Sequence, residues 1–163
     1  MKPIKLNLQK ESLADFQKNN PVDQVIDHYE SILKELFLIQ NPIFRFNPNH
    51  QKELADFIAN HLKGNPMEET GNWFYFPWDK TLVHYLPDEL HQEIRTARNK
   101  NLISKEEQDN YYNFNVGIAG LSVGSHAATT LAMMGASRII KLADPDEISG
   151  SNLNRIRYDY TKV

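Results

Sequence analysis

The chain has 163 residues, 40% hydrophobic and 24% charged, a balance typical of a folded domain with or without an appendage. It has no cysteine, which excludes disulfides, thiolate metal sites and cysteine nucleophiles. The net charge is −3 without a basic cluster, which argues against nucleic acid as the main partner, and no apolar run is long enough to cross a membrane. The first residues also lack the apolar stretch of a secretory signal. We therefore expect a cytoplasmic protein.

The N-terminal part predicts helices. Residues 1–19 are polar and weakly patterned, and we expect a loose arm there. Asn20-Pro21 then combines a capping residue with proline at a first helical position. Apolar residues recur at helical spacing from there to Phe37, and Pro42 would end the helix. The pattern predicts one long helix over this stretch.

A second helix and a hairpin follow. Helical spacing predicts a helix over residues 49–62, ended by Gly64. Residues 73–78 and 81–86 are rich in aromatic and β-branched residues and predict two strands around a tight turn. Five aromatics in six residues could form a stacking platform for bases. We favour a packed hairpin, because no basic residues interleave with the aromatics.

Two further helices lead to a change in character. Pro87 opens a predicted helix that reaches Arg98, and residues 104–107 read Ser-Lys-Glu-Glu, a capping box that starts a short helix. From Phe114 onward the sequence is richer in apolar and small residues. We therefore expect two regions, a helical one with a hairpin over residues 1–113 and a second one over 114–163.

The second region has the order strand, glycine-containing turn, helix, strand. The four predicted elements are residues 116–119, 120–125, 126–134 and 138–143. Such an order in about thirty residues is typical of a βαβ unit of a nucleotide-binding fold. The predicted fold class is α/β: a helical N-terminal region with a small hairpin, then the first, incomplete βαβ of a Rossmann-like domain.

The glycine turn is an imperfect version of the dinucleotide fingerprint. Gly120, Ser122, Gly124 and Ser125 are its candidate binding residues, since a tight turn at a helix start offers N–H groups to phosphates. Other fingerprint glycines are replaced, by Ala119 and Leu121. A purely structural strand–helix junction is the alternative.

An acidic residue strengthens the nucleotide interpretation. Asp144 lies 20 residues after Gly124, at the end of the second strand. A carboxylate there can accept hydrogen bonds from ribose hydroxyls.

The residues that follow resemble a known signature. Residues 143–155 read Ala-Asp-Pro-Asp-Glu-Ile-Ser-Gly-Ser-Asn-Leu-Asn-Arg. This is similar to the ThiF/MoeB and ubiquitin-activating enzyme superfamily, in which a strand ending in Asp-x-Asp precedes Ser-Asn-Leu-Asn-Arg. The spacing also agrees, with eight residues from Asp144 to Asn152 and three more to Arg155. The likeness covers about residues 93–157.

A narrower likeness reaches back to about residue 70. Residues 73–78, 82–84 and 93–99 resemble a bacterial subfamily of larger ThiF-like proteins. Some of those proteins also carry a nitroreductase-like region.

The resemblance implies that the full-length protein binds ATP and Mg²⁺ and adenylates a carboxylate. The acceptor would be the C-terminus of a ubiquitin-like or sulfur-carrier protein, and the protein would be a homodimer. Asp144, with Asp146 of the same motif, would hold the ribose, while Asn152 and Arg155 would contact the triphosphate. Arg98 would match a further arginine of the family that often reaches across the dimer. The family's catalytic lysine and metal-binding aspartate would lie beyond residue 163, so we expect this chain to be an N-terminal fragment without activity of its own.

Alternatives from other classes remain. The 20-residue spacing also suits a redox protein that binds NAD(H) or a flavin, and a degenerate turn suits a scaffold that has lost nucleotide binding. Gly-Leu-Ser-Val-Gly at residues 120–124 fits the nucleophile elbow of α/β-hydrolases, with Ser122 as nucleophile. The six histidines show no metal-ligand spacing, and we expect no protein-held metal from them.

Overall fold

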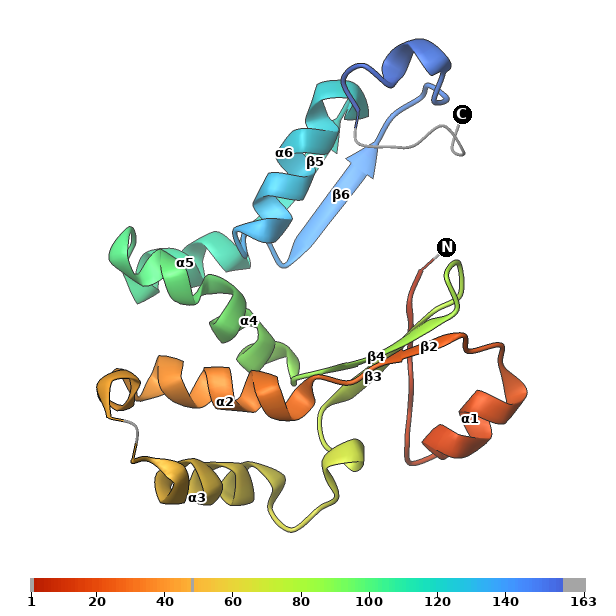
Figure 1. Cartoon of the computed structure of the whole chain (residues 1–163). Coiled ribbons are helices and arrows are strands. Elements are labelled where there is room, and N and C mark those ends of the chain that lie inside the picture. The colour runs from red at the N-terminus through yellow and green to blue at the C-terminus, as the bar shows by residue number, and fades with distance from the viewer. Residues whose placement is uncertain (1, 48, 157–163) are drawn as a thin grey trace. The chain divides into compact units, whose positions relative to one another are not determined.

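A computed structural model describes residues 2–47 and 49–156. The chain divides into two compact units, residues 1–94 and 95–163, called here the N-terminal and C-terminal units. Each unit contains both helices and strands (Figure 1), so the chain is a mixed α/β protein as predicted.

The N-terminal unit is built on a four-stranded sheet. The strands are β1 (Ile4–Lys5), β2 (Gln24–Ile26), β3 (Asn72–Phe76) and β4 (Thr81–Tyr85), in the order β1-β3-β4-β2. β3 pairs antiparallel with β1 and β4, whereas β2 pairs parallel with β4. The predicted hairpin is therefore confirmed, and it forms the centre of the sheet.

The expected loose arm over residues 1–19 is wrong. Its first part is strand β1, and its second is helix α1 (Leu13–Asn19). Ser12 caps this helix by accepting a hydrogen bond from the Asp15 backbone N–H. Phe16 is buried and packs edge-on against Tyr75, with ring centroids 5.3 Å apart. The burial of Phe16 therefore orders a segment whose polar composition does not predict a helix.

The predicted helix start at Asn20-Pro21 is also wrong. Residues 24–26 form strand β2, and helix α2 (Tyr29–Gln40) begins only after it. The spacing of the apolar residues between Pro21 and Ile26 fits a helix as well as a strand. This segment is a strand because it pairs with β4. Just before this helix, Asp27 Oδ1 accepts the backbone N–H of Tyr29, its first residue, at 3.0 Å.

Two more helices cover the N-terminal unit as expected. Helix α3 spans Gln51–Leu62 and ends where Lys63 and Gly64 take positive φ angles of 51° and 83°. Helix α4 spans Asp88–Thr96, and short 3-10 turns occupy η1 (Pro42–Phe46) and η2 (Met67–Glu69). The core beneath these helices contains Tyr29, Leu33, Leu36 and Leu86.

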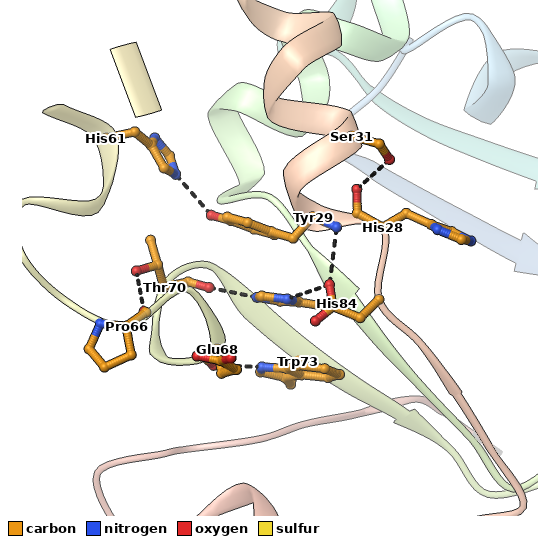
Figure 2. A network of polar contacts seen from close by, with 10 residues as sticks. His28, Tyr29, Ser31, His61, Pro66, Glu68, Thr70, Trp73 and His84 are labelled. Atoms are coloured by element: carbon orange, nitrogen blue, oxygen red, sulfur yellow. Dashed lines mark hydrogen bonds and ion pairs between the residues drawn. The ribbon is translucent and has the colours of Figure 1, made fainter. Parts of the chain in front are cut away.

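A buried histidine joins α2 to the hairpin (Figure 2). The ring of His84 lies between Tyr29 and Trp73, with centroids 4.1 Å and 4.2 Å away. Its Nδ1 lies 3.0 Å from Asp27 Oδ1 and its Nε2 lies 2.6 Å from the Thr70 carbonyl oxygen. Each ring nitrogen therefore has an oxygen acceptor within hydrogen-bond distance, and the ring is stacked between two aromatic faces. His84 is thus a satisfied core residue.

The C-terminal unit has the predicted strand–helix–strand order. Strands β5 (Asn115–Ala119) and β6 (Ile139–Ala143) pair in parallel, and helix α6 (Leu121–Met133) connects them. Helix α5 (Lys105–Asn113) precedes them, with the predicted capping box at Ser104 and Glu107. The 3-10 turns are η3 (Ala97–Asn101) and η4 (Gly150–Asn152). Residues 157–163 of the predicted second region lie outside the described residues.

The units divide earlier than residues 113/114, where the sequence placed the boundary. The reason is that η3 and α5 are bonded to the end of α6. Asn99 Nδ2 donates to the Met134 carbonyl at 3.1 Å, and the Ser137 backbone N–H donates to the Tyr111 carbonyl at 2.9 Å. The segment before β5 therefore belongs to the C-terminal unit.

Among residues 2–47 and 49–156, the structure has no helix that is both long and apolar enough to span a membrane.

Candidate functional site

A pocket of about 640 Å³ lies where β5 and β6 end and α6 begins. Apolar side chains of α6, β6 and the following loop form part of its wall, among them Ala128, Leu142 and Ile148. Most of the site residues that the sequence predicts also line it, namely Ser122, Ser125, Asp144, Asp146, Asn152 and Arg155. The motif residues therefore share one cavity.

The two predicted glycines shape this site without lining the pocket. Gly120 connects β5 to α6 with φ of +84°, a conformation that side chains rarely adopt, and its N–H donates to the Ala143 carbonyl at 2.9 Å. Gly124 lies one turn into α6, where a Cβ atom would stand 2.7 Å from Ile118 Cγ2. The first glycine makes the turn, and the second lets helix and strand approach.

The predicted turn is shorter than the sequence suggested. Helix α6 begins at Leu121, directly after Gly120, and not at His126. Ser122 and Ser125 are thus helical residues of the first turns. The first N–H groups of a helix have no intrahelical partner, so this end of α6 can attract anions.

Asp144 already binds the start of α6. Its Oδ2 accepts the Leu121 backbone N–H, and its Oδ1 accepts the Asp146 backbone N–H at 2.9 Å. These two bonds, the Leu121 bond first, lower the pKa of Asp144 below its ordinary value of 3.8. The carboxylate is ionised at neutral pH and its position at the end of β6 is fixed.

Asn152 is held by one end of its side chain. Its Oδ1 accepts the Ser149 backbone N–H at 2.8 Å and the Ser149 hydroxyl at 3.1 Å, which caps η4. The other end of the amide carries two N–H donors, which can serve an anionic ligand without adding charge.

Arg155 is tied to α6 and η4 by several bonds. Its Nε donates to Ser122 Oγ at 2.6 Å, and its Nη1 donates to the Ser151 carbonyl at 3.1 Å and Asn154 Oδ1 at 3.0 Å. Its own carbonyl oxygen lies 2.6 Å from His126 Nε2, which donates to it. Arg155 is therefore oriented within the pocket wall.

Sequence reasoning missed the part played by His126. It was set aside with the other histidines for want of metal-ligand spacing. The signal that could have found it is its position four residues after Ser122, which places both side chains on one face of α6.

Arg98, the other arginine predicted for the site, lies apart from the pocket. It is an exposed residue of η3 and is not among the described residues that line the cavity. Its predicted role across a dimer remains a prediction.

The geometry at Ser122 disfavours the hydrolase alternative. A nucleophile elbow strains its serine, whereas the non-glycine residues with positive φ in the described part are Lys63, Lys80 and Ser137. The Ser122 hydroxyl also accepts from a guanidinium, which removes electron density from a would-be nucleophile.

The pocket combines one arginine with carboxylates of Asp144, Asp146 and Glu147. The described residues contain no cluster of three or more His, Asp or Glu side chains able to hold a metal. The arginine can donate to an anionic group of a ligand, and the carboxylates can accept from its hydroxyl groups.

Two comparisons with known proteins found matches to this chain. Residues 96–163 match the ThiF family model. The chain is 35% identical over 132 residues to an uncharacterized protein, MT1398, of Mycobacterium tuberculosis (strain CDC 1551 / Oshkosh). That alignment covers 80% of this chain and 18% of the mycobacterial protein, so the chain spans about a fifth of that relative's length. No solved structure matches significantly.

Proposed function

We propose that the whole protein binds ATP in this pocket and adenylates a carboxylate, because residues 96–163 match the ThiF family model. In that reaction a carboxylate oxygen of the acceptor attacks the α-phosphorus of ATP. The bond from that phosphorus to the bridging oxygen breaks, which gives an acyl-adenylate and pyrophosphate. The full-length protein would then be an ATP-dependent adenylyltransferase.

One observation carries the proposal. Asp144, Asn152 and Arg155, which the signature spaces along the sequence, line a single pocket at the ends of parallel strands. Ligands of open α/β sheets bind at this edge. The pocket volume of about 640 Å³ also lies within the range of small-molecule and cofactor sites, roughly 300–1,000 Å³.

Each side chain suits a part of ATP. The ionised Asp144 can accept from ribose hydroxyls, and the guanidinium of Arg155 can donate to phosphate oxygens and offset charge that moves onto pyrophosphate. Asn152 can add neutral donors through its amide. When bound with ATP, Mg²⁺ would neutralise part of the phosphate charge and bring the phosphate oxygens together.

The acceptor and the assembly belong to the same proposal. A ubiquitin-like or sulfur-carrier protein would present its C-terminal carboxylate, and a homodimer would give Arg98 a place beside the partner's nucleotide. NAD(H) is the competing ligand, because a carboxylate at the end of the second strand can hold its ribose equally well.

The test is isotope exchange between labelled pyrophosphate and ATP, catalysed by the purified whole protein with Mg²⁺. Candidate carriers are supplied with a free C-terminal carboxylate, and the control is the same carrier with a C-terminal amide. Label should enter ATP with the free carboxylate alone. The proposal fails if no candidate supports exchange and the protein does not bind ATP.

A further inference from the structure

Helix α6 touches Arg155 at two points that lie one helical turn apart. Ser122 Oγ accepts from the guanidinium Nε at 2.6 Å, and His126 Nε2 donates to the Arg155 carbonyl oxygen at 2.6 Å. One contact fixes the end of the side chain and the other fixes its main chain. Both contacting side chains are partly buried.

The guanidinium of Arg155 makes its remaining contacts through Nη1. Its Nη1 is occupied by the Ser151 carbonyl and Asn154 Oδ1. Among the described residues no partner contacts Nη2, which carries two further N–H groups. Within the described residues, the planar guanidinium therefore has Nε and Nη1 held, and its Nη2 can donate to an oxygen of a ligand.

We propose that Ser122 and His126 are positioning residues that hold Arg155 so that Nη2 points to a phosphate oxygen of the nucleotide. The inference rests on the proposed function for the identity of the ligand, but the two contacts exist without it. Neither residue touches the reacting atoms in this account, since each acts through Arg155. Holding a long side chain before binding reduces the entropy lost when the ligand arrives.

The charge of His126 is not required for this role. Its Nε2 faces a carbonyl acceptor, so a neutral ring with the proton on Nε2 serves as well as a cation. The titratable and charged side chains of the pocket wall are Asp144, Asp146, Glu147 and Arg155. We thus expect the contact to act through its hydrogen bond and not through charge.

The test compares ATP and adenosine binding by the whole protein and four variants. Ser122→Ala and His126→Ala remove one contact each, while Ser122→Thr and His126→Gln keep the hydroxyl and an N–H donor. Both alanine variants should bind ATP about tenfold more weakly and adenosine unchanged, and the two conservative variants should recover most of the loss. Thr130→Ala, an exposed position of the same helix outside the pocket, should match wild type.

A second measurement separates this inference from the proposed function. Hydrogen–deuterium exchange of residues 149–156 without ligand should be faster in His126→Ala than in wild type or Thr130→Ala. If wild type binds ATP and the alanine variants bind it equally well, the positioning role is overturned while the function stands. If wild type binds no ATP, the function fails, and unchanged exchange in His126→Ala would overturn the two-point contact as well. Equal losses of ATP and adenosine affinity would mean damage to the fold and would also overturn it.

Discussion

The Nε–H group of Arg155 donates to Ser122 Oγ over 2.6 Å, although the two residues lie 33 positions apart in the sequence. The contact joins the first turn of α6 to the loop after β6. It brings the two halves of the sequence signature, the glycine turn and the Asn-Leu-Asn-Arg segment, to one wall of the pocket.

Replacing Arg155 with alanine should weaken the binding of ATP more than the binding of NAD⁺. Removal of charge-assisted bonds to phosphate costs about 1.5–3 kcal/mol, which is roughly ten- to a hundredfold in affinity. Arg138→Ala removes an exposed arginine of the same unit outside the pocket and should leave both affinities unchanged. Titration calorimetry of both variants checks this. Equal effects of Arg155→Ala on the two nucleotides would contradict the assigned role.

Asp144 should make the stability of the C-terminal unit sensitive to acid. Its pKa is lowered in the folded state by the Leu121 and Asp146 N–H groups, so its contribution is complete well above its ordinary pKa of 3.8. That contribution is lost as the pH falls through the lower pKa of the folded protein. Asp144→Asn should therefore melt at a lower temperature than wild type at pH 7, and the gap should shrink below about pH 4. A gap that is independent of pH between 7 and 3 would contradict the bonds.

The sequence predicted the site better than it predicted the contacts inside it. Asp144 could be predicted from its place at the end of a strand, and Asn152 and Arg155 from the resemblance of their segment to a family signature. The bonds of Ser122 and His126 to Arg155 depend on the path of the loop after β6 over α6. No local sequence pattern predicts that path.

The same limit explains the errors in the fold. Residues 20–26 carry apolar side chains that suit either a helix or a strand, and pairing with β4 selects β2. The polar composition before Asn20 conceals Phe16, whose burial against Tyr75 orders α1. The hairpin and the capping box at Ser104 were predicted correctly, because their signals are local.

Gly124 should tolerate no side chain. A Cβ atom there would meet Ile118 Cγ2 at 2.7 Å, which forces helix and strand apart. Gly124→Ala should lower the free energy of unfolding by about 1–3 kcal/mol. Gly117→Ala is the matched control, because a Cβ at Gly117 meets no atom within 4 Å, and it should change stability by less than about 0.5 kcal/mol. Urea unfolding of both variants measures the difference, and equal stabilities would contradict the close approach.

Tyr29 should ionise well above the ordinary tyrosine pKa of 10. Burial, helped by the charge of Asp27, raises its pKa to about 12. The lowered pKa of His61, caused by burial and by Lys63, keeps that ring neutral at pH 7, so its Nε2 can accept from the Tyr29 hydroxyl 2.9 Å away (Figure 2).

The stabilisation from neutral Tyr29 is complete below pH 10, the ordinary pKa, and is lost as the pH rises through about 12. Ultraviolet titration of the folded protein should show a tyrosine that ionises near pH 12 and that is absent in Tyr29→Phe. The same variant should lose about 1 kcal/mol of unfolding free energy at pH 8. Uniform ionisation of all tyrosines near pH 10 would contradict the account.

Calorimetric titration of the whole protein with ATP·Mg²⁺ and then with NAD⁺ measures whether the pocket binds a nucleotide, and which one. The account predicts saturable binding of ATP·Mg²⁺, with NAD⁺ weaker or absent. Binding of NAD⁺ alone would contradict it in favour of a redox protein. Absence of both would mean that the pocket at Asp144 and Arg155 is inherited structure without a nucleotide.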